Sequence, residues 1–228
     1  MYFAAYLAVA LAFALVFAGL IKKAPWPFYL VALVLSALYA YCWYSGQLLK
    51  MPRFLIPGLR SCMLGTAFLV LVMYLGALSE KNPVRRRLGS IRAELSIIGA
   101  FLCVGHISTF ASSYLPLAGD DIRLRVAVPL VAAFVLTALL IMLTATSFAA
   151  VKRAMGAKRW KRVQCWAYLF YAVVFFHLMW FVAMRATGGN ARGIIDVAVY
   201  GAVFLIYAVL RVAKALHERQ ARDSKEQS

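Results

Sequence analysis

Residues 2–27 read YFAAYLAVALAFALVFAGLIKKAPWP. The run from Tyr2 to Ile21 is apolar without interruption and has the length of roughly 20 residues that an α-helix needs to cross a bilayer. Two lysines and a Pro-Trp-Pro cluster then end it, as is usual where a helix leaves the membrane. No positive segment precedes the run, and two lysines follow it. We therefore expect an uncleaved anchor rather than a signal peptide.

Similar runs fill the rest of the chain. Of its 228 residues, 64% are hydrophobic and 14% are charged, more apolar side chains than a soluble domain of this size could bury. The runs long enough to span a bilayer are about 2–21, 28–45, 61–79, 95–116, 126–147, 163–184 and 194–213. We predict an all-α polytopic membrane bundle of about seven transmembrane helices over residues 1–213, with a cytoplasmic tail at 214–228.

The basic residues orient this bundle. The chain has 25 Lys and Arg against 8 Asp and Glu, but they lie between the apolar runs, which disfavours nucleic acid as a partner. Alternate connections hold 18 of them on one side: Lys22, Lys23, Lys81, Arg85, Arg86, Arg87, Arg92, Lys152, Arg153, Lys158, Arg159, Lys161, Arg162, Arg211, Lys214, Arg219, Arg222 and Lys225. The other side holds seven: Lys50, Arg53, Arg60, Arg123, Arg125, Arg185 and Arg192. The positive-inside rule then places the N-terminus outside and the C-terminus in the cytoplasm.

The sequence contains no soluble catalytic motif. A glycine-rich phosphate loop, a zinc-binding helix motif and a serine-nucleophile elbow are all absent. The four cysteines show no CxxC pair and no metal-finger spacing, and we interpret them as buried thiols: Cys42, Cys62, Cys103 and Cys165. Any chemistry must therefore belong to the membrane interior.

Two of the three histidines lie inside apolar runs, where an ionisable side chain is costly and is a candidate functional residue. His106 follows Arg92, the last basic residue before its run, by 14 residues, and His177 follows Arg162 by 15. At ~1.5 Å per residue both lie roughly 21 to 22 Å above the cytoplasmic boundary. Two imidazoles at one depth could bind one metal, and a haem iron with two axial histidines is the leading candidate. His217, in the tail, is interpreted as solvated.

A stripe of small and polar side chains surrounds His106 on the fourth span. At helical spacing its members are Ser96, Gly99, Cys103, His106, Thr109 and Ser113. A flat macrocycle could lie on this face, so Cys103 and Thr109 are predicted to line the pocket. The sixth span supplies a bulky apolar wall: Phe170, Val173, Val174, Trp180 and Phe181. Small residues also promote close packing of membrane helices, and a buried histidine can bond a neighbouring carbonyl, which is the alternative interpretation.

A family resemblance rests on five segments. They are Arg85-Arg86-Arg87-Leu88-Gly89, the helix that bears His106, Thr146-Ser147, Lys158-Arg159-Trp160, and the run from Tyr168 to His177-Leu178-Met179-Trp180. On these residues the chain resembles the ferric reductase-like transmembrane family, and within it the haem-b membrane subunits of bacterial periplasmic methionine-sulfoxide reductase systems. The resemblance covers roughly 95 of 228 residues. It implies a haem-binding core at about 80–213, with His106 and His177 as axial ligands of one extracytoplasmic b-type haem.

The chain departs from this family in two ways. Many members have a further histidine 13 residues before the position of His177, where this chain has Gln164, and the matching level of the fourth span is Arg92 or Ala93. One haem is therefore expected. The basic loops and Gln164 could hold the phosphate of a flavin mononucleotide (FMN) or the head of a quinone near the cytoplasmic face, but positive-inside topology and contact with anionic lipid are the favoured explanation of these loops. The first span is additional to the family's six-helix core and could contact a partner subunit.

These observations predict a b-type cytochrome subunit in the bacterial inner membrane. It would relay electrons from a cytoplasmic flavin reductase or a membrane quinol, through one haem, to an extracytoplasmic oxidoreductase or acceptor protein. The alternative is a haem-free membrane protein, either a small transporter or an assembly scaffold, in which the His106 stripe is a packing seam or a proton relay. Asp196 is the one acid expected inside a span, which argues against a proton-coupled transporter.

Overall fold

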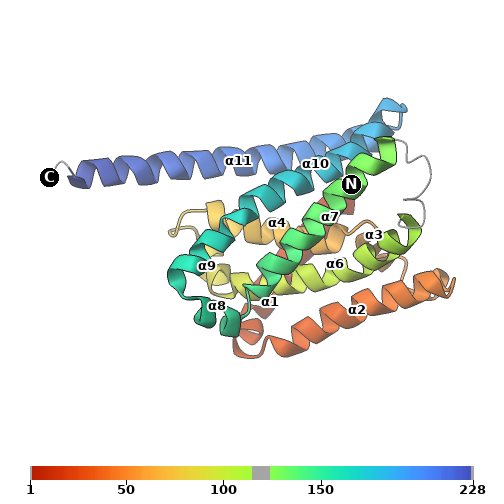
Figure 1. The fold of residues 1–228 in the computed structure, drawn as a ribbon, viewed down its shortest axis with the longest axis horizontal. Helices are drawn as coiled ribbons and strands as arrows, with labels where there is room; N and C mark the ends of the chain where they lie inside the picture. The colour runs from red at the N-terminus through yellow and green to blue at the C-terminus, as the bar shows by residue number, and fades with distance from the viewer. Residues whose placement is uncertain (1, 115–123, 227–228) are drawn as a thin grey trace.

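The computed structural model describes residues 2–114 and 124–226. Within these residues every regular element is a helix, so the all-α prediction is confirmed (Figure 1). The long helices are α1 (Tyr2–Lys23), α2 (Trp26–Tyr44), α4 (Met63–Ala77), α6 (Arg92–Tyr114), α7 (Leu124–Ala145), α10 (Trp166–Thr187) and α11 (Ala191–Glu226). Each begins close to a predicted span, because the apolar runs and their Lys, Pro and Gly flanks decide where a helix can lie in lipid. The predicted end of the fourth span at 115–116 and Arg123 lie outside the described residues.

Short helices form most of the connections. They are η1 (Leu48–Lys50), α3 (Leu55–Arg60), α5 (Pro83–Leu88), η2 (Gly89–Ile91), α8 (Ala149–Met155) and α9 (Ala157–Gln164). At the start of α5, the Asn82 side-chain oxygen accepts hydrogen bonds from the backbone N–H groups of Val84 and Arg85, at 3.0 and 3.3 Å. Gly156, at a φ of 73°, lets the chain turn between α8 and α9. These connections return each long helix beside the bundle.

Five of the long helices form a closed ring. In cyclic order α4 packs against α6, α6 against α7, α7 against α10, α10 against α11, and α11 against α4. Outside this ring, α1 lies on α4 and α2 lies on α6 (Figure 1). The C-terminal part of α11 extends beyond the bundle, so the predicted tail is helical as far as Glu226 (Figure 1). The predicted haem-binding core of 80–213 omits α4, which is a member of the ring.

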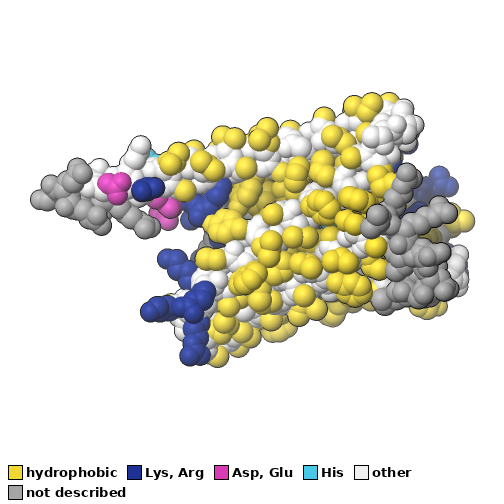
Figure 2. All heavy atoms as spheres, turned by 45° about the horizontal axis from the view of Figure 1, so that its top comes forward, with side chains coloured by type: hydrophobic (Ala, Val, Ile, Leu, Met, Phe, Trp, Pro, Cys, Tyr) yellow, Lys and Arg dark blue, Asp and Glu magenta, His cyan; other side chains and the backbone are white. Residues whose placement is uncertain are grey.

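The outer surface of the bundle is apolar. Figure 2 shows hydrophobic side chains over the middle of the molecule and lysine and arginine side chains gathered towards its ends. Large apolar side chains that would be buried in a soluble protein are exposed on this surface: Val16 is 71% exposed, Leu205 66% and Val131 63%. An apolar belt of this extent is stable only against lipid. With six described helices long and apolar enough to cross a bilayer, the chain is a multi-pass membrane protein.

The third predicted span differs from the other six. α4 has 15 residues, which at ~1.5 Å per residue gives about 22 Å, less than the roughly 30 Å of a hydrocarbon core. Most of its residues are buried, because α1, α6 and α11 cover it on three sides. The apolar run at 61–79 therefore reflects burial in protein rather than contact with lipid, a distinction that hydropathy alone does not make.

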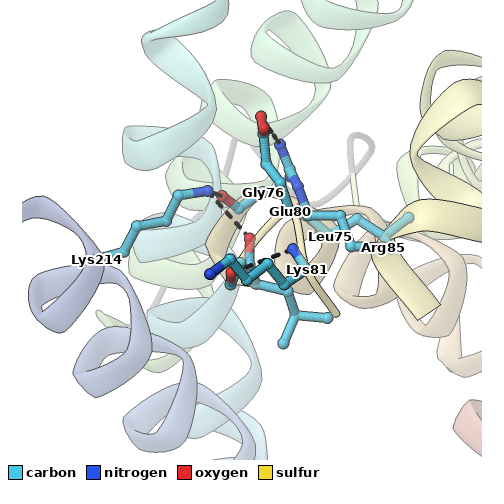
Figure 3. Close-up of polar contacts among 8 residues, drawn as sticks. Leu75, Gly76, Glu80, Lys81, Arg85 and Lys214 are labelled. Carbon is cyan, nitrogen blue, oxygen red and sulfur yellow. Dashed lines mark hydrogen bonds and ion pairs between the residues drawn. The ribbon is translucent and has the colours of Figure 1, made fainter. Parts of the chain in front are cut away.

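Basic side chains donate hydrogen bonds to the backbone carbonyl groups at the C-terminal end of α4. The Lys214 ammonium group on α11 donates to the carbonyl oxygens of Gly76 and Leu78, at 3.0 and 3.1 Å, and the Arg85 guanidinium on α5 donates to the carbonyl of Leu75 (Figure 3). The last carbonyls of a helix have no partner within the helix and carry the negative end of its dipole. Cations from two other elements therefore stabilise the end of this short helix.

Contacts between helix ends agree with an alternating topology. At the end predicted to be cytoplasmic, the Arg211 guanidinium on α11 donates to the Tyr168 hydroxyl on α10 at 2.8 Å, and Trp26 on α2 lies 6.5 Å from Phe148, measured between ring centroids. At the opposite end, the Tyr6 hydroxyl on α1 donates to the carbonyl of Phe54 at 2.5 Å. Segments expected on one side of the membrane thus lie together.

Candidate functional site

The two intramembrane histidines lie on helices that run in the same direction. Ser96, in the first turns of α6, is hydrogen-bonded to Ser147 at 3.1 Å. The Gln164 side-chain amide, just before α10, donates to the Thr146 hydroxyl at 3.0 Å. Both helices therefore start beside the C-terminal end of α7. In the ring α7 packs against both, while α6 and α10 do not pack closely against each other.

His106 has a defined hydrogen-bond partner. Its Nδ1 atom lies 2.7 Å from the backbone carbonyl oxygen of Arg60, the last residue of α3. Because a carbonyl only accepts, Nδ1 carries the proton and Nε2 of the neutral ring is left as an acceptor. The ring is half-buried and lies 4.5 Å from the ring of Phe110, between centroids. This is the tautomer in which an imidazole can bind a metal through Nε2.

His177 lacks such a partner at Nδ1, which is buried and makes no hydrogen bond. The ring lies beside the Pro129 backbone carbonyl on α7. Phe181 contacts it edge-on, with 5.2 Å between ring centroids. The two predicted ligands therefore lie on helices that both pack against α7. The buried Nδ1 of His177 has no hydrogen-bond partner, which is costly for a polar atom.

Neither Arg60 nor Pro129 was identified from the sequence. Arg60 acts through its backbone carbonyl, for which no side-chain pattern exists. Pro129 did carry a signal, since a proline inside an apolar helical run alters the backbone hydrogen bonding around it. That signal indicates an irregular helix but not which side chain lies beside it.

Part of the small-residue stripe on α6 packs against α4. A Cβ atom on Gly99 would lie 3.1 Å from the carbonyl oxygen of Gly65, so the backbones of α4 and α6 approach closely at these glycines. Cys103 is buried at the same crossing, and its thiol donates to the Gly99 carbonyl at 3.2 Å. Close helix packing, the alternative interpretation of the stripe, thus accounts for Gly99 and Cys103. A role for Cys103 in lining a cofactor pocket stays a prediction.

Another part of the stripe faces α2. Thr109 is only 1% exposed, donates to the Gly105 carbonyl at 2.9 Å and lies near Tyr39 of α2. Gly105 contacts α2 directly, because its backbone N–H donates to the Ser36 hydroxyl at 2.6 Å. The position of Thr109 is therefore explained by packing between α6 and α2. A contact of Thr109 with a cofactor stays a prediction.

The apolar wall predicted on α10 is only partly internal. Phe170 is buried and Val174 packs against the core, whereas Phe181 is 41% exposed. Phe176 borders a shallow apolar hollow on the lipid side, which four residues of α7 also line: Ala127, Val128, Val131 and Ala132. The hollow therefore lies at the seam between α7 and α10, next to the residue that precedes His177.

Near the expected cytoplasmic face, the side chain of Gln164 is already engaged with Thr146. The indole N–H of Trp160 donates to the Thr146 carbonyl at 2.9 Å, and the Lys152 ammonium lies 4.4 Å above the Trp160 ring. This cluster ties α9 to the end of α7. Gln164 therefore has a structural partner, and its predicted contact with a flavin or a quinone stays a prediction.

The basic connection before α6 borders a hollow of about 310 Å³. Its lining residues are Glu80, Arg85, Arg86, Gly89, Ser90 and Arg92. Arg85 is partly neutralised, because Glu80 lies 3.7 Å from its guanidinium group (Figure 3). The remaining positive charge would attract an anion of any kind, including a lipid phosphate.

A cluster of three or more histidine, cysteine or acidic side chains positioned for a metal ion does not occur among residues 2–114 and 124–226. The candidate site there is thus the pair of imidazoles, on two helices that both pack against α7. Such a pair suits a prosthetic group that supplies the other ligands itself.

Comparison with known proteins leaves the family of this multi-pass membrane protein open. A protein of Treponema pallidum (strain Nichols), described as an uncharacterized protein, is 37% identical over 171 residues, which cover 74% of this chain and 47% of that protein. The chain thus spans about half the length of this relative. No family model matches, and no solved structure matches.

Proposed function

We propose that the protein is a b-type cytochrome subunit of the bacterial inner membrane, related to the ferric reductase-like family. It relays electrons from a cytoplasmic flavin or a membrane quinol, through one haem, to an extracytoplasmic reductase or acceptor protein. The observation that supports the proposal is that His106 and His177 lie on α6 and α10, two ring helices that run in the same direction and both pack against α7. Any reaction on a final substrate then belongs to a partner.

The residues present fit a haem in one respect. His106 offers Nε2, since its Nδ1 is held by the Arg60 carbonyl. His177 would also bind through Nε2, and its buried Nδ1 has no hydrogen-bond partner that fixes the ring. When bound, the haem iron supplies one-electron chemistry by alternating between two oxidation states. The protein's own part is to hold two imidazoles in fixed orientations and to exclude water. Phe110 and Phe181 lie against the two rings and serve the second purpose.

The donor side is the basic end of the bundle. The hollow beside Arg86 and Arg92 is open to the phosphate of a flavin or to a lipid headgroup, and both interpretations rest on the same positive charge. The donor is accordingly proposed by class only, as a flavin or a quinol at that face.

The test is the absorbance spectrum of the full-length protein purified from haem-replete cells. The proposal predicts a red protein with the reduced bands of a six-coordinate b-type haem, lost in His106→Ala and in His177→Ala. His217→Ala is the matched control, because His217 is exposed on the C-terminal part of α11 and should leave the spectrum unchanged. A colourless wild-type preparation would rule the proposal out.

A second candidate is a haem-free membrane protein in which α6 is a packing seam. The close α4–α6 crossing at Gly65 and Gly99 favours it, because tight packing accounts for these small residues without a cofactor. Stoichiometric haem in the purified protein would exclude this candidate. A correctly folded, colourless protein would leave it as the better description.

A further inference from the structure

The basic connection between α4 and α6 is fixed against the bundle. Asn82 caps α5 by accepting hydrogen bonds from the backbone N–H groups of Val84 and Arg85. Leu88, at the end of α5, and Ile91, at the end of η2, are both fully buried, and α5 and η2 both pack against α1. The basic side chains of this connection therefore project from a backbone that is already ordered, which lowers the entropy cost of binding a ligand.

Two arginines bring uncompensated positive charge to the hollow that this connection borders. Arg85, one of the three arginines in its lining, is held by the Leu75 carbonyl and lies 3.7 Å from the Glu80 carboxylate (Figure 3). The other two are Arg86 and Arg92, which are exposed. Neither of these two makes an ion pair within residues 2–114 and 124–226. Their charges are available to an anion.

The end of α4 brings these cations together. A Cβ atom on Gly76 would lie 3.3 Å from the Arg92 guanidinium group, and the Lys214 ammonium group donates to the Gly76 carbonyl (Figure 3). Basic groups from α5, α6 and α11 thus gather at one helix end, and Glu80 is the one acid among the residues that line the hollow. Like charges repel one another, and a bound anion relieves that repulsion.

The lining of the hollow suits a lipid headgroup better than a flavin. Apart from Gly89, the side chains that line its 310 Å³ are charged or carry a hydroxyl, as Ser90 does, and none is aromatic or aliphatic. The ring system of a flavin needs apolar walls, which these residues do not provide. The headgroup of a phospholipid needs only donors for its phosphate, and arginine provides paired N–H groups in the geometry that phosphate oxygens accept.

The hollow also lies where the acyl chains of a lipid can reach the bilayer. Arg92 is the first residue of α6, so the hollow borders the start of a membrane helix. The neighbouring helix α1 ends at Lys23, and in its last turns Val16 is 71% and Leu20 58% exposed. A phosphate in the hollow would therefore belong to a molecule whose apolar part can lie along α1.

We propose that the hollow between α5, η2 and α6 is a specific binding site for one anionic phospholipid, whose phosphate is held by Arg86 and Arg92. The site is a property of these two side chains rather than of the basic surface as a whole. The inference is independent of the proposed haem. Its bearing on the electron donor rests on the proposed function: a lipid in this hollow leaves a membrane quinol, rather than a flavin held there, as the donor.

The experiment measures lipid binding to the full-length protein in a neutral detergent by native mass spectrometry. The protein is titrated with dioleoylphosphatidylglycerol or with dioleoylphosphatidylcholine, which has the same acyl chains but no net charge. The expected result is a first phosphatidylglycerol that binds in preference to phosphatidylcholine. In Arg86→Gln/Arg92→Gln, the concentration that gives half occupancy should rise roughly thirtyfold, the effect of two basic side chains at a membrane surface.

The matched control is Arg87→Gln/Arg159→Gln. It removes the same charge from the same side of the membrane, but Arg87, on α5, and Arg159, on α9, are exposed residues that do not line the hollow. Its half-occupancy concentration should equal that of the wild type. Gel filtration of each variant before the titration establishes that it is folded.

Three outcomes would overturn the inference. Equal weakening in the two double variants would show a diffuse attraction to surface charge, and equal binding of the two lipids to the wild type would show no selectivity. The third is stoichiometric FMN on the lipid-free wild type that is lost in Arg86→Gln/Arg92→Gln, which would assign the hollow to a soluble phosphate. Because the assay reads the mass of bound lipid, a colourless protein would end the haem proposal and leave this one standing.

Discussion

The Nδ1 atom of His106 lies 2.7 Å from the carbonyl oxygen of Arg60, so a backbone group of the outer connection sets the orientation of a membrane-embedded imidazole. Ligating histidines usually donate their second nitrogen to such a partner, which fixes the ring and its tautomer. His177 has no hydrogen bond at the equivalent atom. The two proposed ligands are therefore held differently, and this difference can be measured.

Free imidazole should replace His106 more readily than His177. In His106→Gly, added imidazole can reuse the Arg60 carbonyl and restore the six-coordinate spectrum. One hydrogen bond contributes about 1 kcal/mol, so His177→Gly should need several-fold to roughly tenfold more imidazole for half recovery. The measurement is a titration followed by the absorbance of the reduced protein. Equal half-recovery concentrations would contradict a role for the Arg60 carbonyl.

The α4–α6 crossing should not tolerate a methyl group. In Gly65→Ala the new Cβ would lie 2.6 Å from the Cys103 sulfur and 2.9 Å from the Gly99 carbonyl oxygen, and relieving such overpacking typically costs about 1–3 kcal/mol. We expect a lower Tm in detergent, measured by the temperature dependence of the gel-filtration peak.

Gly201→Ala is the control for that substitution. Gly201 lies in α11 with open space around its Cβ position, so alanine there should be neutral or stabilising by roughly 0.5–1 kcal/mol through helix propensity. If the Tm falls by the same amount in both variants, the loss does not come from the crossing.

Removing the cation at the end of α4 should destabilise the bundle. Lys214→Met keeps the apolar stem but leaves the carbonyls of Gly76 and Leu78 without their donor, a loss of about 1–3 kcal/mol. The Tm of the purified protein should fall, whereas Arg219→Met, an exposed position on the same helix, should leave it within error. A Tm for Lys214→Met equal to that of the wild type would show that solvent or lipid satisfies these carbonyls.

The predicted orientation can be tested with thiol reagents that do not cross membranes. Cys165 is exposed at the end predicted to be cytoplasmic, so it should be labelled in inside-out vesicles and protected in intact spheroplasts. In a Cys165→Ala background, Leu49→Cys should give the reverse pattern, since Leu49 is 92% exposed in the connection between α2 and α3. Labelling of Cys165 in spheroplasts would invert the topology.

The sequence by itself determined that this protein crosses a membrane several times as helices, and approximately where each helix lies. These conclusions follow from length and hydropathy, because lipid provides no hydrogen-bond partners and the backbone must satisfy itself within each helix. It also identified His106 and His177, since an ionisable residue inside an apolar run stands out without any structure.

Only the tertiary structure decided which apolar surfaces meet lipid and which meet protein. The apolar run at 61–79 looks like a membrane span, and only the neighbouring helices α1, α6 and α11 show that α4 is a short helix buried in protein. The stripe on α6 has the same ambiguity: Gly99 and Cys103 pack against α4, and Thr109 packs towards α2. The close approach of Gly65 to Cys103 and the contact of His106 with Arg60 join segments distant in the chain, and helical periodicity carries no information about such partners.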